Sequence, residues 1–211
     1  MGFAIAAEAA RRGHEVTLIA GPVALKTPKG VKRVDVVSAR EMLAEVKKSL
    51  LTSCCDDLSS GHRGIRPSDH RRNLTVLIAT AAVADWRPAK RAAKKLKKGE
   101  MSGVLKLVRN PDILKTIAGL RRVRSVCPTV AGLKLVGFAA ETNDVLREAA
   151  RKCREKGLEF IVANDVTKKG SGFGTDTDKV TFVFADGTLK FFPLMTKVRV
   201  AKRILDEVSR L

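Results

Sequence analysis

Apolar and polar positions change their period repeatedly along the chain, from the spacing of a helix to that of a strand and back. Apolar residues at helical spacing indicate amphipathic helices, and short apolar or alternating runs indicate strands. Helices and strands are therefore expected to alternate through most of the chain. The pattern predicts helices over residues 3–12, 38–49, 111–120, 143–157 and 197–210, and strands over residues 14–20, 32–37, 74–79, 104–108, 133–138, 160–163, 179–184 and 188–192.

Residues that favour helix ends or turns stand at several of these boundaries. Gly13 is expected to end the first helix, because glycine readily adopts the left-handed conformation found after helices. Residues 38–41 have the sequence of a capping box, and Asn-Pro at 110–111 predicts a side-chain cap followed by proline at the first helical position. Asp-Gly at 186–187 predicts a tight hairpin turn.

Strands separated by helices predict a mostly parallel sheet with helices on both faces. We therefore expect a single α/β domain over residues 1–211, a Rossmann-like three-layer sandwich that ends in a β-hairpin and a helix. In such folds a strand and a glycine-rich loop normally precede the first helix. We expect this chain to start within such a unit, truncated at its N-terminus and without that strand; the alternative is a fold that simply starts with a helix.

Residues 50–73 lack the periodicity of either element. This stretch is rich in Ser, Asp, Arg and Gly, and it is long for a connection inside a compact domain, so we expect a disordered insertion. It contains Cys54, Cys55, His62 and His70, but adjacent cysteines and widely spaced histidines match no standard zinc template. A shifted reading frame or a retained non-coding segment would give a similar composition.

The chain is strongly basic, with 41 Lys and Arg against 22 Asp and Glu and a net charge of +19. Such a charge attracts polyanions in general, but one Trp, no Tyr and eight Phe leave few rings for base stacking. A dedicated nucleic-acid-binding role is therefore not favoured. The four cysteines form no CxxC pair, and no export signal or membrane-spanning run is present, so we expect a soluble cytoplasmic protein.

The segment LIATAAVADWRP at residues 77–88 offers a candidate binding site. Its apolar start predicts a buried strand, which opens at its carboxyl end into alanines and then Asp85. Ligands of α/β sheets bind at such strand ends, where small side chains allow close approach and an acid accepts hydrogen bonds or helps hold a cation. A lysine-rich segment at 94–98 and the sequence RNPD at 109–112 follow, so we predict a phosphorylated ligand.

Motifs of several common enzyme classes are absent from the sequence. It contains no GxxxxGK[ST] loop of nucleotide hydrolases and no GxSxG turn of serine hydrolases. The absence of tyrosine excludes a short-chain dehydrogenase with a catalytic tyrosine. Glycines at 170, 172 and 174 lead into a hairpin rather than a helix, so they predict a flexible turn or lid and not a dinucleotide loop.

Six strings in this order resemble one known family, the phosphopantothenate–cysteine ligases, also called phosphopantothenoylcysteine synthetases. The likeness is to the synthetase half of the bacterial bifunctional coenzyme A biosynthesis protein. With MGFAIAAEAARRG and VTLIAGPVALKTP before them, the strings cover nearly all of the chain except residues 50–73 and the stretch near 121–132. They are AAVADWRP (81–88), KKLKK (94–98), RNPDIL (109–114), VGFAAET (136–142), AND (163–165) and GFGTDTDKV (172–180).

The resemblance implies a set of site residues. Lys95 would reach the phosphates and the reacting intermediate, which makes it the expected catalytic residue, and Gly2 and Asn164 would bind the acid substrate. Lys152 and Lys156 are four apart on one predicted helix, so both ammonium groups are expected on one face. The implied nucleotide-binding positions are Ala81, Ala82, Asp85, Lys95, Asn110, Pro111, Phe138, Lys152 and Lys156.

The resemblance further implies ligation of 4′-phosphopantothenate with L-cysteine through an acyl-nucleotidylate, with CTP or ATP as co-substrate and Mg²⁺ as the metal ion. It implies a homodimer paired through sheet edges, with the lysine-rich segment as a mobile lid, and a flavin-dependent phosphopantothenoylcysteine decarboxylase as partner. No residue discriminates CTP from ATP, and none identifies the metal ligands.

The chain departs from the family pattern before Met1, where a strand and an asparagine-containing loop are expected. Because their donors would be lost, we expect weak or absent ligation. Two alternatives remain at this stage: a catalytically impaired, nucleotide-binding fragment of the family, and a basic nucleic-acid-binding protein.

Overall fold

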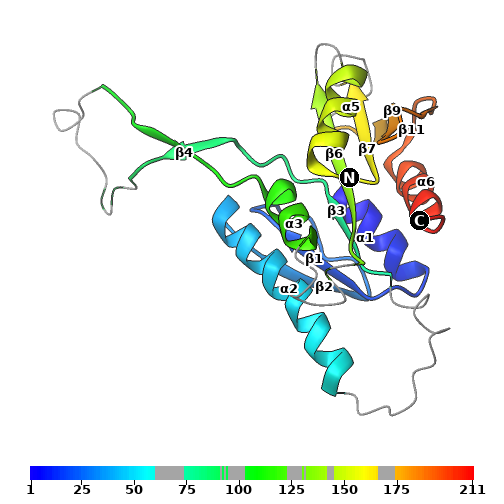
Figure 1. Ribbon diagram of the computed structural model, residues 1–211, viewed down its shortest axis with the longest axis horizontal. Coiled ribbons are helices and arrows are strands. Elements are labelled where there is room, and N and C mark those ends of the chain that lie inside the picture. The colour runs from blue at the N-terminus through cyan, green and yellow to red at the C-terminus, as the bar shows by residue number, and fades with distance from the viewer. Residues whose placement is uncertain are drawn as a thin grey trace.

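The computed structural model describes residues 1–59, 74–90, 92, 94, 103–122, 130, 132–141, 145–165 and 174–211 (Figure 1). Helices and strands alternate along the chain, as the hydrophobic pattern predicts. The described helices are α1 (Gly2–Arg11), α2 (Ala39–Ser59), α3 (Ile113–Arg122), α5 (Val145–Lys156) and α6 (Lys197–Val208). The described strands are β1 (Val16–Ala20), β2 (Val31–Asp35), β3 (Val76–Ala79), β4 (Trp86–Pro88), β5 (Leu107–Arg109), β6 (Lys134–Glu141), β7 (Phe160–Asp165), β8 (Thr177–Asp178), β9 (Val180–Phe184), β10 (Leu189–Phe191) and β11 (Met195–Thr196).

The main sheet has five strands in the order β10-β9-β7-β6-β3. Strands β3, β6 and β7 are parallel, with Ile78 beside Val136 and Val136 beside Phe160, whereas β9 and β10 run antiparallel. The turn of the β9–β10 hairpin contains Gly187 at φ +91°, a conformation that favours glycine. The predicted α/β class, with a C-terminal hairpin followed by a helix, is confirmed.

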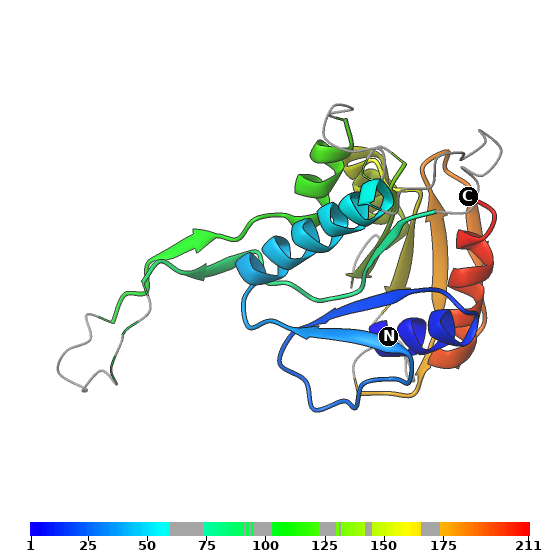
Figure 2. The ribbon, with the colours of Figure 1, turned by 90° about the horizontal axis from the view of Figure 1, so that it is seen from below.

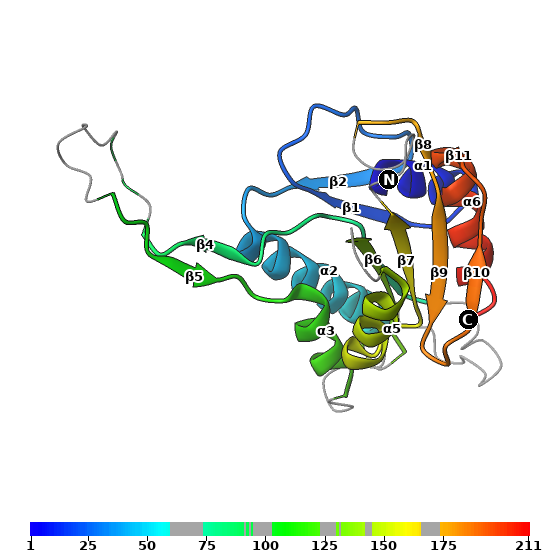
Figure 3. The same ribbon diagram turned by 90° about the horizontal axis from the view of Figure 1, so that it is seen from above.

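Helices cover both faces of the main sheet and form two apolar cores. Side chains of β7 alternate between them: Ile161 packs with α2, α3 and α5, whereas Phe160 and Val162 pack with α1 and α6. This alternation is expected for a strand buried on both faces, because successive side chains point in opposite directions. Figure 3 shows α2, α3 and α5 on one side of β6, β7 and β9, and α1 and α6 on the other. The result is a three-layer sandwich.

An ion-pair network joins α1 to α6 on the second face. The buried carboxylate of Glu8 accepts hydrogen bonds from Arg11 Nη2 at 2.7 Å and Arg12 Nε at 2.9 Å, and Arg12 Nη2 reaches Asp206 Oδ1 at 2.8 Å. The hydrogen bond from Arg11 lowers the pKa of Glu8 to about 2, assisted by Arg12 and opposed by burial. Glu8 is therefore charged at neutral pH. Its charge is compensated by both arginines.

The first two strands form a sheet of their own. Strand β1 pairs in parallel with β2, and no described strand pairs with its other edge. Strand β3 is likewise an edge of the main sheet, paired with β6 alone among the described strands. In Figure 2, β1 and β2 lie as a separate ribbon layer beside α1, apart from the five-stranded sheet.

A two-stranded arm projects from the body between β3 and α3. Its strands β4 and β5 pair antiparallel, with Trp86 beside Arg109, and Figure 3 shows them extending away from every other described element. The guanidinium of Arg109 lies 5.1 Å from the centre of the Trp86 ring, a cation–π contact within the arm. The arm buries little of its own surface: the side chains of Trp86 and Leu107 are exposed.

Several predicted boundaries differ from the structure. Helix α2 continues to Ser59, so the irregular stretch does not start at residue 50, and residues 60–73 lie outside the described ranges. The capping box of α2 is present: Glu41 N donates to Ser38 Oγ at 3.2 Å. The short pair β8–β11 was not predicted from the sequence. Among the described residues, no helix is both long and apolar enough to span a bilayer.

Candidate functional site

A cavity of about 1300 Å³ opens where β3 ends. Strands β1 and β3, helices α1 and α2 and the loop over residues 80–85 contribute to its walls. This is the carboxyl end of a parallel strand, the position at which α/β sheets usually bind ligands. The cavity brings together most of the predicted site residues, namely Gly2, Ala81, Ala82, Asp85, Asn110, Pro111, Phe138, Lys156 and Asn164.

Two predicted site residues are not placed at this cavity. Lys95, the predicted catalytic residue, lies outside the described ranges. Lys152 lies on α5 but is not among the residues that line the cavity, whereas Lys156, one turn further along, is. The structure therefore places one of these two predicted cations at the site, not both.

The loop over residues 80–85 is held in place by Asn110. The backbone N–H of Asn110 donates to Asp85 O at 2.7 Å, and the side-chain Nδ2 of Asn110 donates to Ala84 O at 2.8 Å. The amide oxygen of Asn110 in turn accepts from Arg87 Nη1 at 3.2 Å. Both ends of this side chain are thus engaged, so in the structure Asn110 shapes the loop and leaves the approach to the backbone at Ala81 and Ala82 open.

The predicted cap of α3 is wrong by two residues. Asp112, not Asn110, caps the helix, because Lys115 N donates to Asp112 Oδ1 at 3.0 Å. Pro111 therefore precedes the cap and is not the first helical residue. The other oxygen of Asp112 lies 2.9 Å from Lys156 Nζ. Burial alone would raise the pKa of Asp112, but the Lys115 amide and the Lys156 ammonium outweigh it, so the pKa is lowered.

A buried polar group lies at the end of β7. Asn164 is 8% exposed, and its side-chain oxygen Oδ1 has no hydrogen-bond partner among the described residues. Buried polar atoms of native proteins are nearly always paired, so such an oxygen beside a cavity indicates a ligand or water that completes its hydrogen bonding. The amino group of Met1 lies at the same end: burial lowers its pKa, Lys197 lowers it further, and Asp178 acts in the opposite direction.

The sequence analysis did not select Asp112, Asp178 or Lys197 as site residues, although all three line the cavity. Asp178 lies within a string that carried the family resemblance, so that string could have identified it. Lys197 is the first residue of α6, far along the sequence from residues 77–88, and no local pattern indicates that its side chain lies at the cavity.

Small side chains at the mouth of the cavity are required by close packing. A Cβ atom added to Gly2 would lie 2.6 Å from Thr80 Oγ1, closer than such atoms approach one another. The start of α1 therefore packs against the end of β3.

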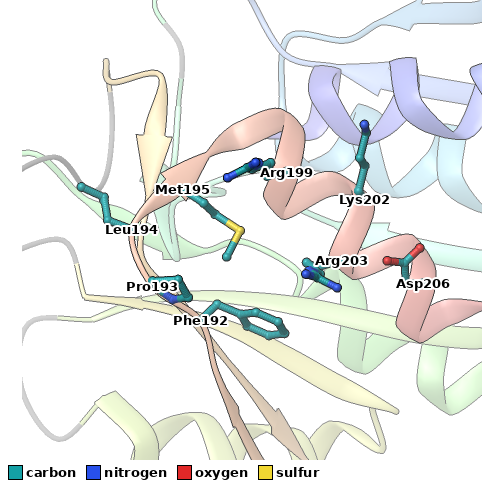
Figure 4. Close-up of a pocket in the computed structure, with 8 residues that line it drawn as sticks. All are labelled: Phe192, Pro193, Leu194, Met195, Arg199, Lys202, Arg203 and Asp206. Carbon is teal, nitrogen blue, oxygen red and sulfur yellow. The ribbon is translucent and has the colours of Figure 1, made fainter.

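A second and smaller cavity, of about 480 Å³, lies beside α6 (Figure 4). Arg199, Lys202 and Arg203 extend from one side of this helix, and Phe192 and Met195 form the apolar wall next to them. It includes none of the predicted site residues. We place the candidate site in the larger cavity, because strand ends and a buried unpaired oxygen meet there. Within the described ranges, no group of three or more His, Cys, Asp or Glu residues is arranged to hold a metal ion.

Comparisons with known proteins give the chain a family. The family model described as the DNA/pantothenate metabolism flavoprotein C-terminal domain matches residues 1–55 and 67–211. The coenzyme A biosynthesis bifunctional protein CoaBC of Escherichia coli K12 is 40% identical over 211 residues, which cover 99% of this chain and 45% of that protein. CoaBC of Bacillus subtilis 168 is 38% identical over 212 residues, which cover 100% of this chain and 45% of that protein. The chain thus spans less than half the length of these relatives.

Solved structures agree with the fold. The C-terminal domain of CoaBC superposes with a TM-score of 0.68 at 35% identity, covering 99% of this chain and 80% of that one. The DNA/pantothenate metabolism flavoprotein from Streptococcus pneumoniae superposes with a TM-score of 0.66 at 18% identity, covering 99% of this chain and 86% of that one. The second likeness shows a shared fold alone.

These descriptions correct the predicted chemistry. The matching family is described as a flavoprotein domain, which contradicts a nucleotide-dependent ligase and, with it, CTP or ATP and Mg²⁺. The impaired nucleotide-binding fragment and the nucleic-acid-binding protein do not fit these descriptions either. The physical reason is that small residues and cations at a strand end suit many phosphorylated ligands, so the pattern does not specify a triphosphate. The resemblance to a bifunctional protein of coenzyme A biosynthesis is confirmed. The chain belongs to the family of DNA/pantothenate metabolism flavoprotein C-terminal domains.

Proposed function

We propose that this chain is part of a coenzyme A biosynthesis enzyme and that its larger cavity binds a phosphorylated derivative of pantothenate. The observation that carries the proposal is the buried Asn164 Oδ1, which has no hydrogen-bond partner among the described residues and lies on the wall of a cavity at the carboxyl end of the sheet. A ligand with amide and hydroxyl groups, such as a pantothenate derivative, supplies the donor that this oxygen needs.

The remaining walls suit the other parts of such a ligand. Lys156 provides a cation for a phosphate, which would replace Asp112 Oδ2 as the partner of its ammonium, now at 2.9 Å. Phe138 and the small side chains of Ala81 and Ala82 provide apolar surface along which an extended acyl chain can lie. The chain's own residues therefore bind and orient the ligand.

A flavin does not fit the described residues of this cavity. Its three fused rings require a broad apolar plane, and the carbonyl oxygens of its pyrimidine edge require donors. Among the described lining residues, Phe138 alone carries a phenyl, phenol or indole ring. The buried Asn164 Oδ1, which has no partner among the described residues, needs a donor, and a carbonyl oxygen of the flavin edge cannot supply one. We therefore assign no chemical step to flavin in this part of the protein.

We further propose that the chain acts as a homodimer joined through the β4–β5 arm. A lone two-stranded hairpin is marginally stable in water, and this one exposes Trp86, Leu105 and Leu107. Pairing of two arms would cover these side chains and the edges of β4 and β5 that pair with no other described strand. Light scattering tests this directly: Trp86→Ser is expected to shift the mass from two chains toward one, and an unchanged mass would contradict the arm as interface.

Calorimetric titration with 4′-phosphopantothenate tests the ligand, with unphosphorylated pantothenate as the comparison. At about 0.15 M salt, where non-specific attraction to so basic a chain is screened, the phosphorylated compound is expected to bind and pantothenate to bind at least about tenfold more weakly. Lys156→Gln is expected to weaken binding of 4′-phosphopantothenate by about tenfold, and Asn164→Leu by a similar factor.

The matched control is Lys152→Gln, which removes the same charge from the same helix one turn away from Lys156. It is expected to leave the affinity within about twofold, because Lys152 does not line the cavity. Equal losses in both variants would show that affinity follows net charge and would contradict the site. Flavin mononucleotide forms the second arm: tighter binding of this compound than of 4′-phosphopantothenate would overturn the proposal and assign the cavity to flavin.

A further inference from the structure

Strand β10 is an edge of the main sheet and pairs with β9 alone among the described strands. Directly after β10, Phe192 N donates to Val180 O at 3.1 Å, so the backbone of Phe192 points toward β9. In an antiparallel pair, successive residues point their backbone groups alternately toward the neighbouring strand and away from it. The N–H and C=O groups of Leu189 and Phe191 therefore face away from β9, along the outer edge of the sheet.

The side chains of β10 alternate between the two faces of the sheet. Lys190 points toward α6, because its Nζ donates to Glu207 Oε1 at 2.7 Å. Leu189 and Phe191 therefore point to the opposite face, where they are 38% and 68% exposed. Uncovered apolar side chains thus accompany an unpaired backbone edge on the same two residues, which is the combination that favours pairing with another strand.

The smaller cavity lies beside the end of β10 and is basic. Arg199 and Arg203 are four apart on α6, so they extend from one side of the helix, and Lys202 lies next to them (Figure 4). Within the described ranges, none of these three cations has an ion-pair partner. Asp206, the acid among the lining residues, is already bonded by Arg12 Nη2 at 2.8 Å. The positive charge of the cavity is therefore uncompensated by the residues around it.

Addition of a strand to β10 would use the backbone edge and the cavity together. In antiparallel addition, which is the more stable pairing, the residues that bond to Leu189 and Phe191 have their side chains on the same face as these two. The residues between them project to the face of α6, beside the cavity. Apolar side chains suit the first set, because they would cover Leu189 and Phe191. Carboxylates suit the second set, because they would face Arg199 and Arg203.

Charge distinguishes a second copy of this chain from another protein as the occupant. Antiparallel pairing of two β10 strands would bring the cations of two α6 helices to one face of the joined sheet, where like charges repel. The net charge of +19 also attracts an anionic partner. We propose that the edge of β10 and the cavity beside α6 bind an extended segment of a partner protein in which acidic and apolar residues alternate.

Hydrogen exchange with a synthetic peptide, Glu-Val-Glu-Val-Glu-Val-Gly, tests the pairing. At about millimolar peptide and about 0.15 M salt, exchange of the Leu189 and Phe191 amides is expected to slow by at least about tenfold. The amide of Phe192 is expected to change little, because it already donates to β9. The control peptide Glu-Glu-Glu-Val-Val-Val-Gly has the same composition without the alternation, and it is expected to protect neither amide. Unchanged exchange of Leu189 and Phe191 with the alternating peptide would overturn the proposal.

Methylation of backbone nitrogens in the peptide tests the direction of the added strand. In the antiparallel arrangement the valines donate to β10 and the glutamates do not, so N-methyl valines are expected to abolish binding. N-methyl glutamates are expected to leave the affinity, measured by calorimetry, within about twofold. Equal losses in the two peptides would contradict strand pairing.

A variant of the chain tests the basic cavity. Arg203→Gln is expected to weaken binding of the alternating peptide about fivefold. The matched control is Arg147→Gln, which removes the same charge from an exposed position on α5 that does not line the cavity and is expected to leave the affinity within about twofold. Equal losses in both variants would show that binding follows net charge and would overturn the proposal.

Two further outcomes would assign this surface to a different occupant. Binding of a seven-nucleotide oligothymidylate that Arg203→Gln weakens, while binding of the peptide is unaffected, would make the surface a nucleic-acid site. Protection of the Leu189 and Phe191 amides that grows with protein concentration, in the absence of peptide, would make the occupant a second copy. Either result would overturn the proposal.

Discussion

The ion pair between Asp112 and Lys156 at the cavity allows a sharp test of the site. Asp112 performs two tasks with its two oxygens, since Oδ1 accepts from the Lys115 amide at 3.0 Å and Oδ2 faces Lys156 Nζ at 2.9 Å. Asp112→Asn keeps an oxygen for the cap and removes the charge, whereas Asp112→Ala removes both. The two variants therefore separate the helix cap from the ion pair.

The magnitudes follow from exposure. The side chains of Asp112 and Lys156 are 40% and 27% exposed, so solvent screens their attraction, and the pair is expected to contribute about 0.5 kcal/mol. Loss of an N-terminal cap costs about 1 kcal/mol. The free energy of unfolding at neutral pH is therefore expected to fall by about 0.5 kcal/mol in Asp112→Asn and by about 1.5 kcal/mol in Asp112→Ala.

The sign of the pH dependence follows from the lowered pKa of Asp112. A carboxyl group with a lowered pKa in the folded state stabilises the protein above its unfolded pKa, ordinarily 3.8, and this contribution is lost as the pH falls through the folded value. The difference between the original chain and Asp112→Asn is thus expected at pH 7 and is expected to shrink below 3.8.

Urea unfolding of the original chain, Asp112→Asn and Asp112→Ala measures these differences in stability. Calorimetric titration of the same three chains measures their affinity for 4′-phosphopantothenate. If Lys156 binds phosphate, its release from Asp112 in Asp112→Asn is expected to tighten binding of 4′-phosphopantothenate several-fold, even though the protein becomes less stable. Equal destabilisation by Asp112→Asn and Asp112→Ala would refute the role of Asp112 as the cap of α3. Weaker binding by Asp112→Asn would refute the role given to Lys156.

Three further predictions concern the framework. Glu8→Gln is expected to flatten the dependence of stability on pH. The charged Glu8 stabilises the fold above its ordinary pKa of 4.5, and this contribution is lost as the pH falls from 4.5 to about 2. Acid unfolding measures the profile, and a profile unchanged by the substitution would contradict the ion-pair network between α1 and α6. Gly137→Val is expected to lower the free energy of unfolding by about 1–3 kcal/mol, since even a Cβ there would lie 2.8 Å from Leu158 Cδ1. Gly119→Ala, at an open helical position, is expected to raise it by about 0.5–1 kcal/mol. Urea unfolding measures both changes. Burial raises the pKa of Cys153 to about 11, so iodoacetamide at pH 7.5 is expected to leave this thiol unmodified in the folded protein and to modify it in urea, as peptide mass mapping would show; rapid labelling of the folded chain would contradict its burial.

The alternation of helices and strands was predictable because its signals are local. The apolar run at 77–79 and the alternating burial along β7 follow from side-chain periods that the sequence displays directly. The turn at Gly187 and the end of α1 at Gly13 are likewise local, since both glycines adopt positive φ. These features depend on a few neighbouring residues and on no distant partner.

Features that depend on distant partners were missed. Asn110 resembles a helix cap in the sequence, but its side chain bonds Ala84 O, 26 residues away, and Asp112 becomes the cap instead. The extension of α2 beyond residue 49 has weak amphipathic signal, yet backbone propagation continues the helix to Ser59. The division into two sheets also depends on pairing between strands that the sequence does not place relative to one another.

The candidate site was predicted in its position more reliably than in its chemistry. Residues 81–85, Phe138 and Asn164 do line one cavity, because the carboxyl ends of parallel strands meet at one edge of the sheet. The residues themselves predicted only a phosphorylated ligand, and its identity as a nucleotide was inferred from the family resemblance alone. A strand end with small residues and a cation accepts phosphate in many forms, so geometry of this kind does not determine the reaction.

The proposed ligand, a phosphorylated pantothenate derivative, binds where β3, β6 and β7 end. Amide chemical shifts measured by nuclear magnetic resonance during titration with 4′-phosphopantothenate test this binding site most directly. The largest shifts are expected at Ala81, Ala82, Phe138 and Asn164, and small shifts along α6. The largest shifts at Arg199, Lys202 and Arg203, with residues 81–82 and 164 unmoved, would place the ligand in the smaller cavity and contradict the proposed site.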